Sequence, residues 1–477
     1  MTMSEARALD APRTLPPGPI ATSEPAGPLE GLRPPIRVVE LELAGTIPDL
    51  LATTSPDGVP YRQALVLVRM HGEPLGLLSL DLPAGLPAGD LARAVWSRFQ
   101  SQIALHLAAD GEPPARQLSA AGLPPREAPP CVPERPFASR DVPLASVVVA
   151  TCDRPFQLLR ALEDVLVQTY PRFELIVVDN RPGAGVTREA VTGRYGADPR
   201  VRYLPEPRVG LSAARNAGLA HARGALVAFT DDDVTIDRHW LSSLAQVFLD
   251  DPETACVTGL ILPLELDTPA QLLFELFGGF SKGFQRRSFD LALNHPPDAL
   301  FPYAAGRFGS GANSAFRTDV LRALGGFAVE LGAGTPTRGG EDLDAHLNVL
   351  HAGHRLVYQP RALVWHPHHL DLPGLSRQIH RYGIGLSAAL SKRLAGGRDE
   401  RRAILRRLPA GLAYAVHPGS VKNRSKGPDY PARLTLLELA GMLRGPITYG
   451  LARRSAGRRN PTHRSGARPP SGVGGGE

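Results

Sequence analysis

Short apolar runs alternate with amphipathic segments between residues 145 and 233, and this alternation limits the folds open to the chain more than any other feature. The apolar runs cover residues 146–151, 173–178, 201–204 and 225–229. Their length and nearly continuous apolar character are typical of parallel strands buried on both faces. The intervening segments include one helix starting at Pro155, which suits a first helical turn, and another over 211–222. The pattern predicts an α/β fold, an open parallel sheet with helices on both faces.

Acidic residues directly follow two of these runs. Asp179 follows the second run, and Asp231, Asp232 and Asp233 follow the fourth. Ligands of open α/β sheets bind beyond the carboxyl ends of the strands, where all four residues would lie. Three adjacent carboxylates repel one another, and Mg²⁺ or Mn²⁺, which prefer oxygen ligands, would relieve that repulsion. A solvated acidic turn is the alternative, but the strand-end position shared with Asp179 favours a metal site.

Five blocks between Ser146 and His366 resemble, in order, the motifs of family 2 glycosyltransferases of the GT-A fold. The blocks are residues 146–155, 177–180, 210–218, 230–233 and 340–344, the last followed by 353–360. The resemblance implies a Rossmann-like domain that binds a nucleoside-diphosphate sugar, uses Mg²⁺ or Mn²⁺ and transfers the sugar with inversion. The acceptor would be the hydroxyl of a glycan, a lipid-linked glycan or a small molecule. Such an enzyme would serve cell envelope or glycan biosynthesis.

The resemblance also implies a donor side with a nucleotide-sugar pocket and a metal. The nucleotide-sugar pocket would be formed by Thr151, Arg154, Asp179, Arg215, Asn216, Asp231 and Asp232. Asp233, Asp231 and His366 would bind the cation, which clamps the diphosphate as the sugar leaves. Two alternatives stay open: Arg215 and Asn216 as ordinary polar helix residues, and His366 as part of a surface histidine cluster with His368 and His369.

On the acceptor side, the resemblance implies that Asp342 is the general base and that Glu341 shares the work or holds the acceptor. Both would lie in the first turn of a helix after Gly339 and Gly340. Stabilisation of the helix dipole is the alternative role of the two acids. Residues 309–316 would line the sugar and acceptor pocket, or form a plain buried strand.

The flanks of this region lie outside the resemblance. The predicted organisation is disorder over 1–30, a small α+β domain over 31–107, a Pro-rich linker over 108–143, the GT-A domain over 144–370, a helical segment over 371–455 and a disordered basic tail over 456–477. Strand alternation over 37–43, a hairpin turn at His71-Gly72 and a helix over 91–107 support the small domain.

Charge is distributed unevenly along the chain. Residues 391–477 carry 18 Lys/Arg and 5 Asp/Glu, although the net charge of the whole chain is only +6. The apolar stretch 434–451 with the arginines that follow suggests peripheral contact with an anionic membrane. Two other functions are considered. A nucleotidyltransferase would need a Gly-rich, basic signature that 151–155 lacks. A non-enzymatic polyanion-binding protein would act through the basic tail, where stacking aromatics are few, so no nucleic acid partner is expected.

Cysteine usage and hydropathy bear on the compartment. Cys131, Cys152 and Cys256 show no paired spacing, which argues against a disulfide framework and against a thiolate zinc site, and favours a reducing compartment. We find neither a secretory signal nor an apolar run of the roughly 18 residues that cross a bilayer. The expectation is a cytoplasmic protein, with the inner face of the plasma membrane as the place of any peripheral contact.

Overall fold

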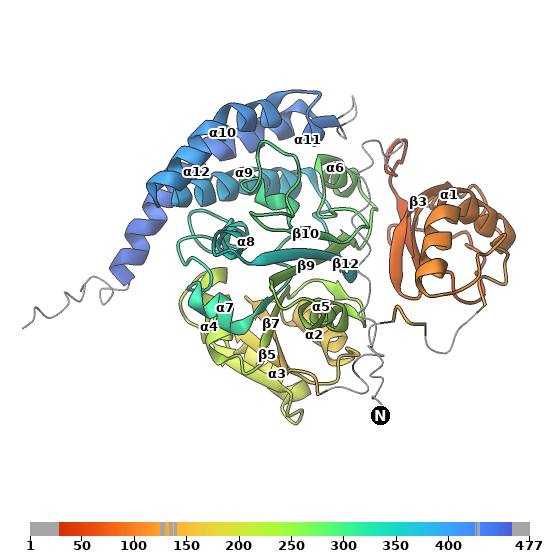
Figure 1. Cartoon of the computed structure of the whole chain (residues 1–477), viewed down its shortest axis with the longest axis horizontal. Helices are drawn as coiled ribbons and strands as arrows, with labels where there is room; N and C mark the ends of the chain where they lie inside the picture. The colour runs from red at the N-terminus through yellow and green to blue at the C-terminus, as the bar shows by residue number, and fades with distance from the viewer. Residues whose placement is uncertain are drawn as a thin grey trace, which may run out of the picture.

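The computed structural model describes residues 28–124, 129–132, 137, 141–424, 426 and 430–459 of the chain. These residues form three parts: an N-terminal unit, a central α/β domain and a set of C-terminal helices that lie across the central domain (Figure 1). Residues 28–30 of the stretch predicted to be disordered form a turn, and the rest of that stretch lies outside the described residues.

The N-terminal unit is a three-stranded sheet covered by one helix. Its elements are β1 (Ile36–Glu42), β2 (Gln63–Met70), β3 (Glu73–Asp81) and α1 (Ala88–Ala109). β1 runs parallel to β2, and β2 pairs with β3 in an antiparallel hairpin, which confirms the predicted turn at His71 and Gly72. Leu118 and Leu123 are buried in the same core as α1. The unit therefore continues past residue 107 into the stretch predicted to be a linker.

The predicted parallel strands form one half of the central sheet. They are β4 (Ala145–Thr151), β5 (Phe173–Asp179), β6 (Val201–Pro205) and β7 (Leu226–Asp231), in the order β7-β4-β5-β6. All neighbouring pairs are parallel. Along β4, Val147 and Val149 contribute to one apolar core and Val148 to the other. The strand is therefore buried on both faces, as its continuous apolar run predicts.

The second half of the sheet departs from the predicted parallel arrangement. It contains β8 (Thr235–Ile236), β9 (Thr254–Pro263), β10 (Arg287–Phe289), β11 (Asn313–Arg317) and β12 (Arg355–His366). β11 lies antiparallel between β7 and β9, and β12 runs parallel to β9. Of residues 309–316, predicted to line a pocket, 309–312 line a large cavity and 313–316 belong to a buried strand. The strands predicted to be parallel are parallel, the added strands make the whole sheet mixed, and the α/β class is confirmed.

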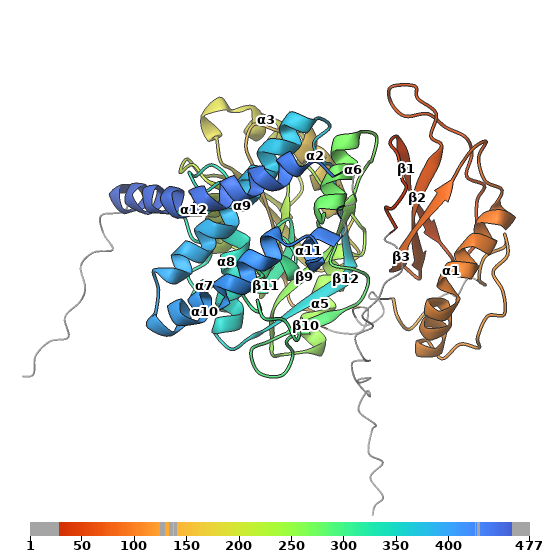
Figure 2. The same cartoon turned by 90° about the horizontal axis from the view of Figure 1, so that it is seen from above.

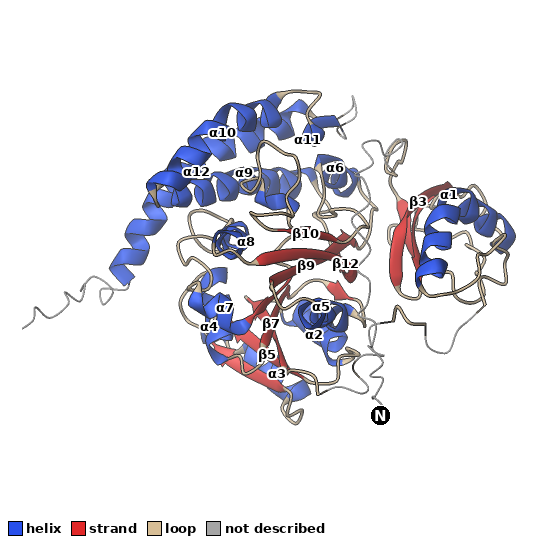
Figure 3. Ribbon diagram, in the orientation of Figure 1, coloured by secondary structure: helices blue, strands red, loops and turns tan. Residues whose placement is uncertain are grey.

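Helices cover both faces of this sheet (Figure 3). α2 (Pro155–Leu166), α3 (Val186–Tyr195) and α5 (Trp240–Asp250) pack on one face. α4 (Leu211–His221), α7 (Thr318–Ala323) and α8 (Glu341–His351) pack on the other. The remaining short elements are η1 (Pro182–Ala184), η2 (Ala305–Arg307) and α6 (Pro269–Phe277).

The C-terminal part is helical, as predicted. It contains α9 (Leu372–Leu394), α10 (Arg398–Val416), α11 (Val421–Arg424) and α12 (Ala432–Arg459). α9 and α12 cross closely at glycines: a Cβ on Gly383 would lie 2.1 Å from the carbonyl oxygen of Glu438. α12 continues past residue 456, where the disordered tail was predicted to begin, and residues 460–477 lie outside the described part. Among the described helices, none is both long and apolar enough to cross a membrane.

The N-terminal unit lies beside the central domain (Figure 2), and polar contacts join the two. Arg69 on β2 makes a buried ion pair with Asp237, at 2.7 Å between Nη1 and Oδ2. Tyr61 donates its hydroxyl proton to Asp267 at 2.7 Å, and the amide of Ile36 donates to the carbonyl of Leu266 at 2.9 Å. These contacts give the unit a defined position against the sheet.

Candidate active site

The metal-ligating residues predicted from sequence converge at the carboxyl edge of the sheet. Asp231 is the last residue of β7 and His366 is the last residue of β12. Asp231, Asp233 and His366 each offer one ligand atom, and these atoms all lie within 4.8 Å of one another. The pairing of Trp365 with Thr235 on β8 brings the end of β12 beside the residues that follow β7. Strand pairing therefore places His366 next to the aspartates.

The donor set fits a divalent cation that takes oxygen and imidazole ligands. His366 Nδ1 lies 2.7 Å from the carbonyl oxygen of Pro367, a contact that fixes the tautomer with Nε2 free to ligate. Burial lowers the pKa of His366, which favours the neutral, ligating imidazole, although Asp233 acts in the opposite direction. Two carboxylates and one imidazole suit Mn²⁺ or Mg²⁺.

Asp232 has a different role from its neighbours. Its carboxylate is 6% exposed, accepts a hydrogen bond from Thr151 Oγ1 at 2.6 Å and lies 3.4 Å from Arg154 Nη1. Burial raises the pKa of Asp232 to about 6. Arg154 Nη1 also lies 2.8 Å from Asp233 Oδ2. Thr151 and Arg154 therefore hold the turn that presents the metal-ligating aspartates.

Asp179, the predicted contact of the nucleobase, is fully buried at the end of β5. Its Oδ2 accepts a hydrogen bond from the Tyr203 hydroxyl at 2.7 Å, and its Oδ1 accepts one from the amide of Arg181 at 2.9 Å. One oxygen thus holds the loop that follows the strand, and the other is bonded to the neighbouring strand β6. Tyr203, on the neighbouring strand β6, was not predicted, because nothing in its local sequence indicates that it faces Asp179.

Arg215 on α4 links the two sides of the site. Its Nη2 lies 3.1 Å from Asp231 Oδ1 and its Nη1 lies 3.1 Å from Glu341 Oε1. The side chain also donates to the carbonyl of Gly311 at 3.1 Å and is almost fully buried. This cation therefore holds a metal-side carboxylate and an acceptor-side carboxylate in one arrangement.

Asn216, predicted beside Arg215, makes its hydrogen bonds to a backbone segment outside the cluster of acidic residues. Its Nδ2 donates to the carbonyl of Phe327 at 2.7 Å, and its Oδ1 accepts from the amide of Phe327 at 2.8 Å. Successive helix residues point about 100° apart, so the side chain after Arg215 faces away from the contacts that Arg215 makes with Asp231 and Glu341. The role of Asn216 as a donor contact stays a prediction.

Glu341 and Asp342 form the first turn of α8, as predicted. The turn before them depends on Gly340, which has φ 90° and approaches Gly385 so closely that a Cβ would lie 2.3 Å from its carbonyl oxygen. Burial, and the charge of Asp342, raise the pKa of Glu341, whereas Arg215 acts in the opposite direction. Asp342 Oδ2 accepts a hydrogen bond from the amide of Gly311 at 2.9 Å. The less buried Asp342 is the better placed of the two acids to reach a substrate.

His346 follows Asp342 by one helical turn and was also not predicted. Its side chain is fully buried, and neither ring nitrogen has a hydrogen-bond partner. Burial lowers the pKa of His346 to about 4. The imidazole stacks against Phe316 on β11, with ring centroids 6.2 Å apart. It supports the start of α8 from within the core as a neutral ring.

A cavity of about 4000 Å³ lies against part of this site. Its lining includes Asp231 and His366 on the metal side, and Glu341 and Asp342 on the acceptor side. A typical small-molecule site occupies about 300–1,000 Å³, so this cavity has room for a donor and an acceptor together. Two exposed arginines at the cavity, Arg338 and Arg381, were not predicted and add positive charge on the acceptor side.

Part of the chain is similar in sequence to known glycosyltransferases. Residues 146–325 match the family described as Glycosyl transferase family 2. The pre-mycofactocin glycosyltransferase of Mycobacterium tuberculosis is 33% identical over 168 residues, which are 35% of this chain and 32% of that protein. The glucosyl-dolichyl phosphate glucuronosyltransferase of Haloferax volcanii is 26% identical over 230 residues, 46% of this chain and 68% of that protein. The chain thus spans about a third of the length of the mycobacterial relative.

A solved structure is also similar. It is the mannosyltransferase PcManGT from Pyrobaculum calidifontis in complex with GDP-Man and Mn²⁺, at 20% identity and a TM-score of 0.43. The match covers 65% of this chain and 92% of that one.

Proposed function

Since the chain carries a glycosyl transferase family 2 domain, we propose that it transfers a sugar from a nucleoside-diphosphate sugar to an acceptor hydroxyl, with a divalent metal and with inversion. The observation that carries the proposal is the single cavity with Asp231 and His366 on one side and Glu341 and Asp342 on the other. Such a site has a metal position for the leaving diphosphate and a base for the attacking hydroxyl, the two requirements of direct displacement.

Asp342 is the proposed general base. Its carboxylate would take the acceptor proton as the hydroxyl attacks the anomeric carbon. Glu341 is held by Arg215 and is more buried, so it is better suited to positioning than to accepting a proton. A cation held by Asp231, Asp233 and His366 would neutralise the charge on the departing diphosphate. Mg²⁺ and Mn²⁺ both fit these ligands.

The rim of the cavity favours a lipid-linked acceptor. Leu408, Leu412 and Leu443 line the cavity and are 52%, 58% and 79% exposed. Exposed apolar side chains beside a polar site suit an acceptor with an apolar chain, and Arg338 and Arg381 would face a phosphate group. The name of the archaeal relative, a glucosyl-dolichyl phosphate glucuronosyltransferase, points to an acceptor of this kind.

A peripheral membrane contact would accompany a lipid-linked acceptor. On α12, Leu443, Ile447 and Leu451 follow one another at spacings of one helical turn and are 79%, 67% and 49% exposed. Arginines in the same helix, Arg453 and Arg454 among them, would face anionic headgroups. We place this contact at the cytoplasmic face of the plasma membrane.

The function is tested by screening nucleoside-diphosphate sugars for binding and hydrolysis with and without Mn²⁺ or Mg²⁺. We expect one donor to bind and to be hydrolysed slowly only when the metal is present. Formation of a nucleotide sugar from a nucleoside triphosphate and a sugar phosphate would instead identify a nucleotidyltransferase. Failure of every donor to bind with metal present would reject the proposal.

The membrane contact is tested by sedimentation with liposomes that contain anionic lipid. We expect the pair Leu443→Ser and Ile447→Ser to reduce binding, and high salt to reduce it further. Leu105→Ser, at a residue on α1 that is 72% exposed, is the matched control. Equal sedimentation of both variants and the wild type would exclude α12 as the membrane-binding element. Salt-sensitive binding that disappears on deletion of residues 460–477 would assign the contact to the basic tail.

A further inference from the structure

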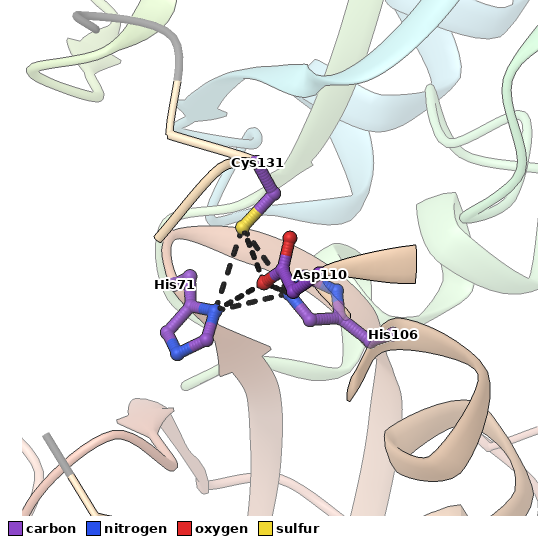
Figure 4. Close-up of side chains that lie close together, drawn as sticks. All are labelled: His71, His106, Asp110 and Cys131. Atoms are coloured by element: carbon purple, nitrogen blue, oxygen red, sulfur yellow. Dashed lines mark hydrogen bonds and ion pairs between the residues drawn. The ribbon is translucent and has the colours of Figure 1, made fainter. Parts of the chain in front are cut away.

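A second group of metal-ligating side chains lies in the N-terminal unit, outside the family 2 domain. Its members are His71, His106, Asp110 and Cys131 (Figure 4). His71 occupies the turn between β2 and β3, and His106 lies in the last turn of α1. Asp110 is the residue that ends α1, so it shares a face with His106 four residues earlier. Cys131 comes from the segment that connects the unit to β4.

Each ligand atom of this cluster lies close to the other three. His71 Nδ1 is 3.2 Å from His106 Nε2, 3.0 Å from Asp110 Oδ2 and 3.4 Å from Cys131 Sγ. Asp110 Oδ2 is 3.0 Å from Cys131 Sγ and 3.4 Å from His106 Nε2. The last separation, between Cys131 Sγ and His106 Nε2, is 3.4 Å. Six nearly equal separations are the edges of a tetrahedron.

The size of this tetrahedron is close to that of one metal ion and its ligands: three of the six separations are 3.4 Å, and the other three are 3.0–3.2 Å. Zinc lies about 2.0–2.3 Å from imidazole nitrogen, carboxylate oxygen and thiolate sulfur, so neighbouring ligand atoms of a tetrahedral site are roughly 3.3–3.7 Å apart. We propose that His71, His106, Asp110 and Cys131 bind a zinc ion. Each of the four atoms offers a lone pair, and a central cation satisfies all of them at once. The thiol proton of Cys131 is released to solvent when the thiolate binds.

Surrounding residues orient these ligands. Glu73 Oε2 lies 3.4 Å from Nδ1 of His106, the ring nitrogen opposite the cluster, and a carboxylate in this position is the usual outer partner of a zinc-bound histidine. The backbone amides of His71 and Gly72 both donate to the Glu42 carboxylate at 2.9 Å. His71 has φ 51°, a conformation in which non-glycine residues are uncommon. The carboxylate of Glu42 thus secures a turn that directs His71 into the cluster.

The cluster also touches the central domain. Arg361 on β12 donates hydrogen bonds to the backbone carbonyls of His71 and Cys131. The side chains of His71, Asp110 and His106 are 5%, 2% and 7% exposed. Four protein ligands and little solvent access describe a structural rather than a catalytic zinc site. The ion would fasten the hairpin turn, the end of α1 and the connecting segment beside β12.

The proposal is tested on the full-length protein by metal analysis. After purification without added metal and dialysis against EDTA, which removes a weakly held cation from the active site, we expect about one zinc per chain. Cys131→Ser and His106→Gln should each lose it. Cys152→Ser and Asp233→Asn are the matched controls and should retain it. Zinc content that is zero in the wild type, or unchanged by Cys131→Ser, would overturn the proposal.

A second measurement does not depend on the folding of variants. Cobalt titrated into metal-free wild-type protein should produce the strong visible bands of a tetrahedral site and a near-ultraviolet thiolate charge-transfer band. Zinc added afterwards should displace the bound cobalt. A cobalt spectrum of weak, octahedral type and without the thiolate band would show that the cysteine does not ligate, and the proposed site would be wrong.

Discussion

The active-site cluster and the N-terminal cluster differ in the number of protein ligands and in their surroundings. Asp231, Asp233 and His366 form a group of three, and two of them line the large cavity. The N-terminal cluster has four ligands: the side chains of His71, His106 and Asp110 are at most 7% exposed, and Cys131 is half-buried. Catalytic metal sites keep a coordination position for substrate, whereas structural sites are closed by protein ligands. The two clusters therefore differ in number of protein ligands and in solvent access as catalytic and structural metal sites do.

Ligand chemistry separates the two sites as well. Two carboxylates and an imidazole suit Mg²⁺ or Mn²⁺, which exchange readily with a substrate diphosphate. A thiolate with two imidazoles favours zinc over these harder cations. The two clusters can therefore hold different ions in the same cell. The comparison predicts that their metals can be removed independently.

The largest expected effect is that of Asp233→Asn, which removes one carboxylate from the group of three. Loss of outer-shell partners alone costs about 10–100-fold in metal affinity, so loss of a ligand should weaken metal-dependent nucleotide-sugar binding by more than about 100-fold. Calorimetric titration with and without Mn²⁺ measures this. The zinc content of the variant should equal that of the wild type. Loss of zinc along with donor binding would mean that the two clusters are not independent.

The second prediction concerns the base. General-base assistance contributes about 10²–10⁴-fold, so Asp342→Asn should lower kcat by about that factor and leave donor affinity nearly unchanged. Glu341→Gln should cost less, because Glu341 is held by Arg215. Asp319→Asn is the control: Asp319 is also in the first turn of a helix and accepts from the next amide, as Asp342 does. A larger loss in Glu341→Gln would reassign the base.

The parallel half of the sheet and the positions of its strand-end aspartates could be predicted because their signals are local. A continuous apolar run that ends in aspartate identifies a buried strand and its carboxyl end, so Asp179 and Asp231 were placed correctly at the sheet edge. The antiparallel course of β11 could not be predicted, since strand direction depends on the path of the chain between strands. The hydrogen bonds of Asn216 to Phe327 could not be predicted either, because the sequence block shows the residues of a helix without the face that each one occupies.

The N-terminal cluster left no local signal. Its ligands come from residues 71, 106, 110 and 131, spacings that no paired-cysteine pattern describes. Three cysteines without paired spacing argued against a thiolate zinc site in the sequence, because such sites are recognised by repeated cysteines. The folded hairpin and helix bring two histidines and an aspartate to that cysteine. The evidence for this site is therefore the short distances between the four side chains in the folded protein, and not their spacing in the sequence.

The third prediction contrasts the partnered histidines of the cluster with the unpartnered His346. Burial lowers the pKa of His346 to about 4 from its usual 6.5. The unfolded chain therefore binds a proton at higher pH than the folded chain, and stability falls as pH drops from 6.5 towards 4, by up to about 1.4 kcal/mol per pH unit. Urea unfolding at a series of pH values measures this. His346→Leu should flatten the dependence, whereas the exposed His295→Leu should not; equal slopes in both would reject the assignment.

The smallest effect is expected for Arg361→Met, at the residue where the two regions meet. Arg361 donates to the carbonyls of His71 and Cys131 from β12, the strand that also carries His366. Removal of this side chain leaves two part-buried carbonyl groups without a hydrogen-bond donor, which costs about 1–3 kcal/mol. Urea unfolding should measure this cost as a lower free energy of unfolding. Arg93→Met, at an exposed arginine, is the control.

Because the pairing of Trp365 with Thr235 still positions His366, donor binding should stay near the wild-type value and zinc should be retained. A loss of zinc would make Arg361 part of the N-terminal site. A loss of donor binding would instead show that the position of β12, and so of the active-site histidine, depends on the N-terminal unit.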